Sequence, residues 1–398
     1  MTGIRRRSLI VAGAAGSAAA ALLTTTGAPA FAGARRPDDD GAVVPGWNAE
    51  LLAAVRTPGA QPATVHPTRS FALMHLAVRD AALVCDRRAS PAAAAARAAH
   101  DVLAALFPAR AARFAERLAR DLAAVPDAGA RDRGVHNGQT AAAVVLHVRA
   151  DDGAGATPPA IPPGTRPGEW RPAAPAFTPA VFTHWAHVRP FGLARASQCR
   201  PAPYPRLSAA LYDEVRVLGR DTGTARTADQ TEQARFWAAP IWNSWFEIAQ
   251  GLTTGHHLGV VPAAHLFARL AAVLADTVIA FYDAKYHFRI WRPVTAIREL
   301  GDPQWLPLAT TPADPSYVGA HSAVGQAAAT VLAATFGRRQ ALSVTSESLP
   351  GVSRTFRSLQ AAADEAGLSR IYAGVHTRID HRAGQELGIH VARYSRHG

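Results

Sequence analysis

The sequence contains a single lysine. Of its 42 lysine and arginine residues, only Lys285 is a lysine. At exposed positions arginine replaces lysine at little cost, but a site that needs a compact ammonium group does not accept the exchange. The sequence therefore singles out Lys285 as a residue that a buried or functional site requires.

Cysteine is almost absent, since Cys85 and Cys199 are the only two in 398 residues. The chain is thus no disulfide scaffold, although one bridge is open to it if it leaves the cytoplasm. Hydrophobic residues make up 48% of the sequence, so a large core can form without a metal or a disulfide. No segment alternates apolar and polar residues over the length of a typical β-strand. The many alanine-rich segments instead indicate an all-α fold.

Apolar spacing and alanine content predict helices on both sides of a long loop. Ser90 followed by Pro91 is a favourable helix start, with a capping side chain and proline at the first position. Residues 152–205 are rich in proline and glycine but carry several aromatic residues, which predicts an ordered loop wrapped over the helices. The expected helices are 48–56, 69–84, 91–106, 109–124, 130–150, 206–220, 227–250, 262–284, 321–336, 358–366, 369–380 and 382–395.

The N-terminus has the pattern of an export signal. A basic start is followed by a short apolar stretch and the tripeptide Ala30-Phe31-Ala32, and Arg6-Arg7 is typical of the twin-arginine type. We predict a signal over residues 1–32, a flexible linker over 33–45 and a helical domain over 46–398. The expected location is secreted or extracytoplasmic, with no transmembrane helix in the mature chain.

The charge balance is strongly basic, at +12 for the whole chain and +9 without the three arginines of the signal. The arginines are scattered singly, and no basic run or interleaved aromatic pattern suits nucleic acid. Attraction of small anions fits this distribution better.

Three segments of the last third carry candidate chemistry. Lys285 and Arg292 lie close in sequence, and two such cations repel each other unless a shared anion lies between them. His321 stands at the start of a small-residue helix, where backbone N–H groups and the helix dipole favour an anion. Residues 369–380 are expected to be helical, with His376 and Asp380 on one face, so that the carboxylate orients the imidazole.

The spacing Lys-x6-Arg-Pro, the helix-start histidine and Ser-Arg-x5-His-x3-Asp together resemble the vanadium haloperoxidases and their acid phosphatase relatives. Further segments resemble the bacterial haloperoxidase branch, so that the similarity covers about 46–396. These segments are GEWRPA, HWAHVRPFGL, ARTADQTEQARFWA and DAKYHFRIWRPVTAI.

This resemblance implies a fold of two packed four-helix bundles and a haloperoxidase-like oxidoreductase. The implied cofactor is vanadate, with phosphate as a competing occupant of the same site. The implied substrates are hydrogen peroxide, a halide and an unknown organic compound. His376 would be the metal ligand and His321 the proton carrier, with Asp380 orienting His376. The implied cofactor-binding residues are Lys285, Arg292, Ala320 through its backbone N–H, Arg370 and His376.

Two positions depart from the family pattern. Gly319-Ala320 stands where the family has Ser-Gly before the histidine, so the serine hydroxyl is missing. Asp314 stands where halogenating relatives often have an aromatic residue near the halide. Because a carboxylate repels halide, we expect bromide, which gives up electrons more easily, to be oxidised more readily than chloride.

The same residues also suit other functions. An acid phosphatase would use His376 as the nucleophile that forms a phosphohistidine, with His321 as general acid. A vanadium-independent or degenerate relative is a third reading, favoured by the missing serine and opposed by the retained lysine. The sequence leaves the oligomeric state open.

The signal generates the first prediction. Mass spectrometry of the protein recovered from the culture medium of an expressing bacterium should show a mature N-terminus near Gly33, because the Ala-Phe-Ala site precedes it. Exported protein that retains Met1 would contradict it.

Overall fold

The computed structural model describes residues 41–394, whose regular secondary structure is helical apart from one short hairpin. The predicted all-α class is confirmed. The export signal and most of the linker lie outside the described residues. The first helix, α1, begins at Val43 and buries Val43 and Val44, so the end of the expected linker belongs to the helical domain.

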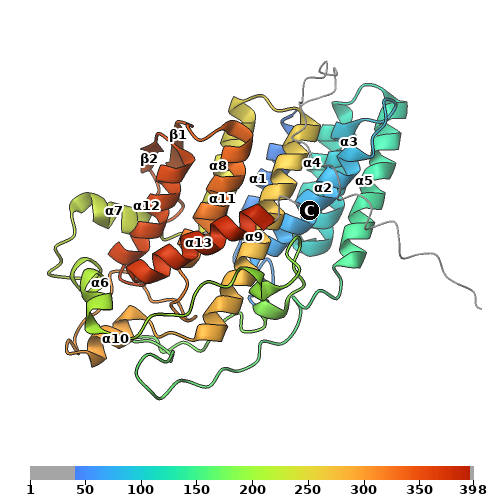
Figure 1. Ribbon diagram of the computed structural model, residues 1–398. Coiled ribbons are helices and arrows are strands. Elements are labelled where there is room, and N and C mark those ends of the chain that lie inside the picture. The colour runs from blue at the N-terminus through green and yellow to red at the C-terminus, as the bar shows by residue number, and fades with distance from the viewer. Residues whose placement is uncertain (1–40, 395–398) are drawn as a thin grey trace, which may run out of the picture.

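The helices pack as two bundles (Figure 1). One bundle contains α1 (Val43–Val55), α2 (Pro67–Leu83), α3 (Pro91–Leu106), α4 (Ala111–Ala123) and α5 (Ala128–Val148). The other contains α8 (Ile241–Gly255), α9 (Val260–Phe288), α11 (Ala320–Phe336), α12 (Leu359–Tyr372) and α13 (Arg378–Tyr394). Helix α9 contacts both α2 and α11 and so joins the two bundles. Short helices complete the chain: α6 (Asp213–Leu218), α7 (Ala228–Phe236), α10 (Pro293–Glu299) and four 3-10 turns at Pro108–Arg110, Trp185–His187, Ala196–Cys199 and Ala209–Tyr212.

Local sequence explains several helix boundaries. The Ser90 hydroxyl accepts a hydrogen bond from the Ala93 N–H at 3.2 Å, which confirms the predicted start of α3. The expected helix 227–250 is instead two helices, α7 and α8. Pro240 lies between them, where proline has no N–H to continue α7 and disfavours helical geometry in the residue before it.

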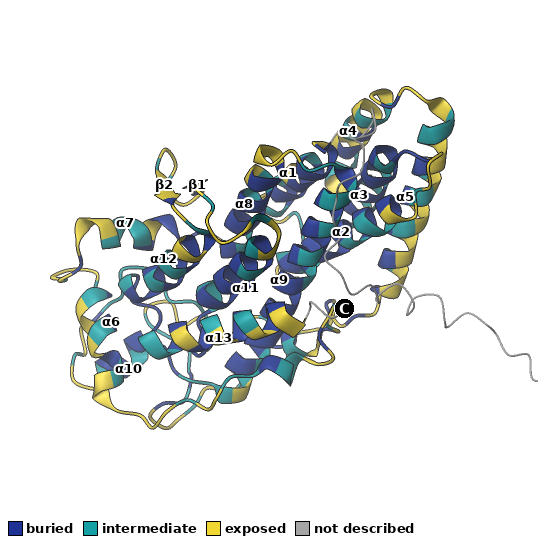
Figure 2. Cartoon of the chain, turned by 45° about the horizontal axis from the view of Figure 1, so that its top comes forward, coloured by how far each residue is buried: buried dark blue, intermediate teal, exposed yellow. Residues whose placement is uncertain are grey.

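Helix α9 is the central element of the core. It is 29 residues long, its most apolar stretch has a mean hydropathy of 1.6, and most of that stretch is buried (Figure 2). By length and composition it matches a membrane span, contrary to our expectation that no span of bilayer length follows the signal. Its burial between two layers of helices identifies it as a core helix.

The long loop is ordered, as predicted, and is fixed to α9 by a buried carboxylate. Asp276 accepts hydrogen bonds from the backbone N–H groups of Phe191, Gly192 and Leu193 at 2.6, 2.7 and 2.8 Å. Three donors satisfy most of the hydrogen-bonding capacity that a buried carboxylate loses on leaving water. The loop therefore lies in one place over the end of α9.

The sequence did not predict α10, which begins at Pro293, or a two-stranded antiparallel hairpin. Strand β1 (Leu342–Thr345) pairs with β2 (Ser353–Phe356), with Leu342 opposite Phe356. Four residues per strand are too few for a recognisable alternation of apolar and polar side chains.

The expected helix 369–380 is wrong. Helix α12 continues to Tyr372, Gly374 adopts a φ of 81°, and α13 begins at Arg378. A positive φ is open to glycine at low cost and ends a right-handed helix. His376 consequently lies in the connection between two helices, and Asp380 lies in the first turn of α13.

Glycine allows α13 to lie directly against the start of α11. A Cβ atom on Gly384 would lie 2.4 Å from the Gly319 carbonyl oxygen, and one on Gly388 would lie 2.2 Å from the Ala323 carbonyl oxygen. Both distances are below any van der Waals contact, so only glycine permits this approach. The packing brings Asp380 to the N-terminus of α11.

We predict that Gly384→Ala lowers the free energy of unfolding by roughly 1–3 kcal/mol, the usual cost of overpacking. The matched control is Gly251→Ala on α8, where nothing lies within 4 Å of the added Cβ. That change should raise the free energy of unfolding by about 0.5–1 kcal/mol, because alanine is the better helix former. Urea denaturation followed by circular dichroism measures both, and equal effects would refute the packing argument.

Candidate oxyanion site

The predicted site residues come together where α9 ends and α11 and α13 begin. Lys285 lies in the last turn of α9, Arg292 immediately before α10, Arg370 in the last turn of α12, His376 before α13 and Asp380 in its first turn. All five are buried, with exposed fractions of 0, 1, 6, 4 and 0%. The grouping expected from sequence spacing is thus present in the structure.

A carboxylate lies between the two cations Lys285 and Arg292, and it belongs to the protein. Asp314 Oδ2 is 3.0 Å from Lys285 Nζ, and Asp314 Oδ1 is 2.6 Å from Arg292 Nη2. Burial alone would raise the pKa of the Asp314 carboxyl, but the adjacent Lys285 and Arg292 hold it well below its usual range. The shared anion that the sequence required is therefore Asp314.

Backbone carbonyls complete the shell around these cations. Lys285 Nζ also donates to the carbonyl oxygens of Pro315 and Ser316. Arg292 donates from Nε to the Asp314 carbonyl at 2.8 Å and from Nη1 to the Val375 carbonyl at 2.9 Å. Burial lowers the pKa of Lys285 to about 8, against the opposing effect of Asp314.

His376 is oriented by Asp380. Its Nδ1 is 3.3 Å from Asp380 Oδ2, and a carboxylate only accepts, so Nδ1 carries the proton and Nε2 keeps its lone pair. Asp380 Oδ2 also accepts from the Thr377 backbone N–H at 2.8 Å and from the Ser316 hydroxyl at 2.7 Å. The expected His–Asp pair forms, although through a turn and not along one helix.

Burial, and next the charge of Arg292, lower the pKa of His376 to about 3, so its imidazole is neutral at neutral pH. Arg292 Nη1 lies 3.3 Å from His376 Nε2. The sequence did not point to Ser316 as a partner of Asp380, because a serine in an irregular segment gives no signal of its contacts.

Arg370 has a buried donor without a partner. Its Nη1 makes no hydrogen bond within the described part of the chain, and burial lowers its pKa to about 10, so it stays charged at neutral pH. A buried unpaired guanidinium nitrogen is costly and suits a site that receives an anion. Asp380 Oδ1 is likewise buried without a partner among the described residues, so it can accept a hydrogen bond from a hydroxyl group of a ligand.

His321 lies in the first turn of α11, beside Arg370 and His376. Its Nε2 is 2.9 Å from the Trp237 carbonyl oxygen, so Nε2 carries the proton and Nδ1 has the lone pair. Burial, followed by the charges of Arg370 and His376, holds the pKa of His321 well below its ordinary value. The ring is neutral and able to accept a proton at Nδ1.

The N-terminus of α11 lacks a side-chain cap. Ala320 is the first helical residue, and the N-cap residue Gly319 donates its N–H to the Asp380 carbonyl at 2.8 Å. The next N–H groups have no intrahelical acceptor and favour an anion. A Cβ on Gly319 would lie 3.0 Å from the Asp380 carbonyl oxygen, so the tight contact with α13 explains why no serine stands here.

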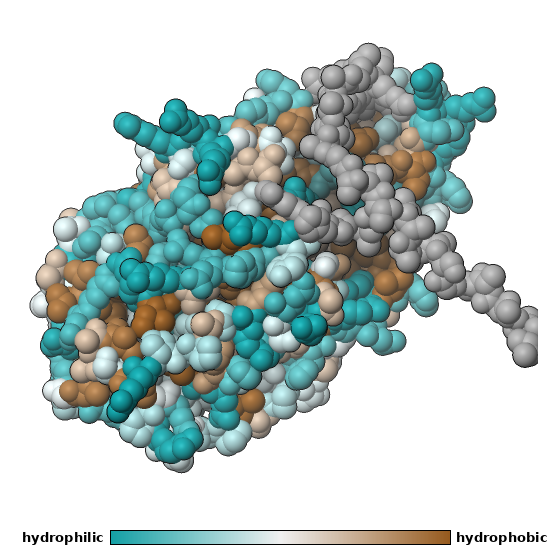
Figure 3. Space-filling model, viewed as in Figure 1, coloured by the Kyte–Doolittle hydropathy of each residue, from teal (hydrophilic) through white to brown (hydrophobic). Residues whose placement is uncertain are grey.

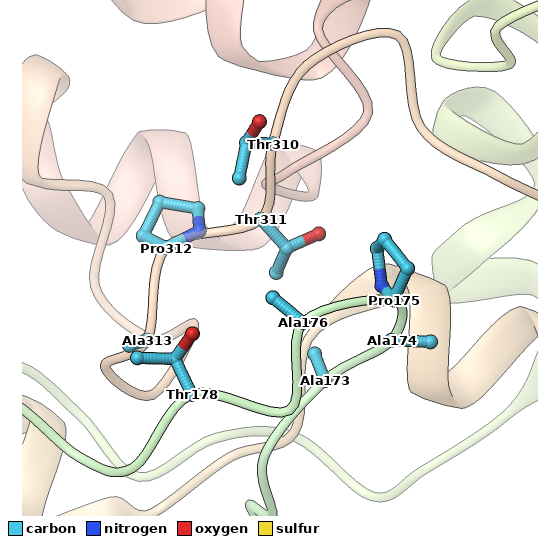
Figure 4. A pocket seen from close by; sticks show the side chains of 9 residues that line it. All are labelled: Ala173, Ala174, Pro175, Ala176, Thr178, Thr310, Thr311, Pro312 and Ala313. Atoms are coloured by element: carbon cyan, nitrogen blue, oxygen red, sulfur yellow. The ribbon is translucent and has the colours of Figure 1, made fainter.

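The long loop borders two surface hollows, and the segment that carries Asp314 lines the first of them. Residues 310–313 face residues 173–178 of the long loop across a pocket with room for about one water, and Figure 4 shows the Thr311 side chain pointing toward Pro175 and Ala176. The Thr311 hydroxyl is buried without a partner there. A larger hollow of about 180 Å³ lies between this loop and α10 and includes Phe177 and Arg298. The cationic cluster itself is buried and lines neither hollow.

Hydrophilic side chains cover much of the molecular face in Figure 3, and hydrophobic ones form scattered patches between them.

Comparison with known proteins accords with this geometry. Residues 265–397 match the VCPO second helical-bundle domain, VCPO being vanadium chloroperoxidase. A solved bacterial vanadium-dependent iodoperoxidase is similar at 23% identity and a TM-score of 0.76, covering 90% of this chain and 95% of its own. No curated protein matches the sequence.

Two further solved structures are of bacterial vanadium-dependent chloroperoxidase. The holo-type structure has 16% identity and a TM-score of 0.68, with 86% of this chain and 95% of its own covered. The apo-type structure has 15% identity and a TM-score of 0.67, with 87% and 96% covered.

The protein thus has the vanadium haloperoxidase fold. Its C-terminal third matches the model of the second helical-bundle domain, and the resemblance inferred from the sequence motifs is confirmed for the fold and for this domain.

The residues present fit vanadate. Arg370 offers an unpaired buried donor, the start of α11 offers backbone N–H groups, and His376 offers a neutral, oriented Nε2. Lys285 and Arg292 supply two more cations, which are paired with Asp314 in this structure.

The depressed pKa of His376 generates a prediction for acid stability. Between its folded pKa of about 3 and its unfolded pKa of about 6.5, only the unfolded chain binds this proton, so acidification destabilises the fold. His376→Gln should flatten the fall in unfolding free energy between about pH 6 and pH 4 by up to about 1.4 kcal/mol per pH unit. Urea denaturation at several pH values measures the slope, and an unchanged slope would exclude a neutral buried His376.

Proposed function

We propose that the protein is an exported vanadate-dependent haloperoxidase that uses hydrogen peroxide to oxidise halide. The observation that carries the proposal is the buried group of unpaired Arg370 Nη1 and oriented His376 Nε2 at the start of α11. The names of the similar solved structures, an iodoperoxidase and a chloroperoxidase, support haloperoxidase chemistry.

In this proposal the Arg370 side chain and the Ala320 N–H would hold vanadate oxygens, and His376 Nε2 would bind the metal. Lys285 and Arg292 contribute positive charge to the same site. When bound, vanadate supplies a pentavalent Lewis-acid centre that activates hydrogen peroxide, so no redox partner protein is needed. Asp380 keeps the proton on His376 Nδ1, and His321 takes up or releases a proton at Nδ1 while Trp237 holds its Nε2–H.

Phosphate ester hydrolysis is the second candidate, because the His376–Asp380 pair suits it equally. A neutral imidazole whose Nε2 carries a lone pair is a competent nucleophile once Nε2 leaves its 3.3 Å contact with Arg292 Nη1, and Asp380 would stabilise its positive charge after attack on phosphorus. Arg370 would stabilise the transition-state charge. A degenerate relative without either activity is the third candidate, favoured by Gly319 and by the pairing of both remaining cations with Asp314.

The deciding experiment assays mature protein with vanadate, hydrogen peroxide and each halide, and in parallel with a phosphomonoester in the absence of vanadate. We expect iodide and bromide to be oxidised and chloride least, because chloride gives up electrons least readily and Asp314 adds negative charge near the site. His376→Ala should abolish the activity, and Gly251→Ala should leave it unchanged.

The alternatives predict different results. Phosphatase turnover without halide oxidation would replace the haloperoxidase proposal with the phosphatase. Vanadate binding with neither activity would favour the degenerate reading.

A further inference from the structure

We propose that Asp314 determines which oxyanions the site binds: it occupies Lys285 and Arg292, lowers the affinity for oxyanions and favours monoanions over dianions. The inference rests on the proposed oxyanion site and adds to it a residue that sets charge selectivity. The evidence is the set of contacts that Lys285 and Arg292 make and the net charge of the buried side chains around them.

Every proton of the Lys285 ammonium group has a protein acceptor. The acceptors are Asp314 Oδ2 at 3.0 Å, the Ser316 carbonyl oxygen at 3.2 Å and the Pro315 carbonyl oxygen. An ammonium group has three donors and no more. Lys285 therefore cannot donate to a bound oxyanion without giving up one of these bonds.

All three nitrogens of the Arg292 guanidinium also have protein partners. Nη2 and Nε donate to the Oδ1 and backbone oxygens of Asp314, and Nη1 donates to the Val375 carbonyl oxygen and lies 3.3 Å from His376 Nε2. Arg370 is the contrasting cation, with a buried nitrogen that has no partner. An anion can therefore bind beside Arg370, whereas beside Lys285 the Asp314 carboxylate already takes the place of an anion.

The net charge of the buried side chains explains why the site favours monoanions over dianions. The buried side chains of the site include the cations Lys285, Arg292 and Arg370 and the carboxylates Asp314 and Asp380, and the imidazoles of His376 and His321 are neutral. The buried group thus carries one net positive charge, which a monoanion neutralises. A dianion leaves a buried negative charge, which is costly in a site screened from water.

Asp314→Asn removes the charge with little change of shape. The site then carries one more positive charge, and Lys285 and Arg292 are released to donate to the ligand. We expect dianion affinity to rise on the order of 10- to 100-fold, as for a gained charge-assisted contact. Monoanion affinity should rise by a clearly smaller factor.

Sulfate and perrhenate are suitable probes, because both are tetrahedral oxyanions and they differ in charge. Isothermal titration of the mature protein with each anion gives four affinities for wild type and Asp314→Asn. The matched control is Asp283→Asn, which removes a partly buried carboxylate of α9 that pairs with Arg200 at 2.8 Å, outside the site. This control should leave both affinities unchanged.

A second variant tests whether Asp314 acts through Lys285. Lys285→Met removes a positive charge in either background, but in the wild type, where Asp314 already occupies the ammonium group, it should weaken sulfate binding by a clearly smaller factor than in Asp314→Asn. In the Asp314→Asn background the same change should weaken sulfate binding on the order of tenfold or more. Equal effects of Lys285→Met in the two backgrounds would overturn the proposal.

The stability of the Asp314→Asn variant needs its own measurement, because the change leaves Lys285 and Arg292 buried without a charged partner. If this variant melts near the assay temperature, the rise of its melting temperature with sulfate concentration gives the affinity instead. A rise no steeper than that of the wild type overturns the proposal. Anion binding that is equal in wild type and Asp314→Asn refutes the role of Asp314 alone, whereas no binding of sulfate, perrhenate or vanadate to either protein refutes the oxyanion site as well.

Discussion

The buried ion pairs of Asp314 with Lys285 and Arg292 are the contacts on which the site depends. Lys285 ends the central core helix α9, Arg292 precedes α10, and Asp314 lies in the irregular segment that leads to α11. One carboxylate thus fixes three segments relative to one another. Removing one partner of such a buried pair costs roughly 3–5 kcal/mol, mostly because the other charge remains buried without compensation.

Asp380 is a second fixed point, joined to the first through Ser316. Its side chain accepts from Ser316, Thr377 and His376, and its backbone carbonyl accepts from Gly319. These bonds hold the start of α13 against the start of α11. The imidazole that would bind the metal therefore takes its orientation from the same contacts that pack the two helices.

Only some of the buried polar groups of the site have partners within the described part of the protein. Lys285 and Arg292 are satisfied by the protein, whereas Arg370 Nη1 and Asp380 Oδ1 are buried without partners. Buried polar atoms without partners are rare in folded proteins because each costs desolvation energy. Their presence at one place, beside a neutral histidine and an uncapped helix start, distinguishes a ligand site from a set of structural ion pairs.

Much of this was determined by the sequence. Alanine content and apolar spacing predicted the helices, the Ser90-Pro91 start and the ordered loop, since these depend on neighbours within a few residues. The motif spacings also named the residues that meet in the site, because together they match a known family pattern. The lone Lys285 is indeed fully buried.

The tertiary structure alone decided what these residues contact. Asp314 was expected to lie near a halide, and it bridges Lys285 and Arg292; His376 was expected within a helix, and it lies in a turn made by Gly374. The hairpin and the role of Ser316 were also absent from the sequence prediction. Such pairings join residues up to 64 positions apart in the chain, and spacing cannot predict them because they depend on how whole helices pack.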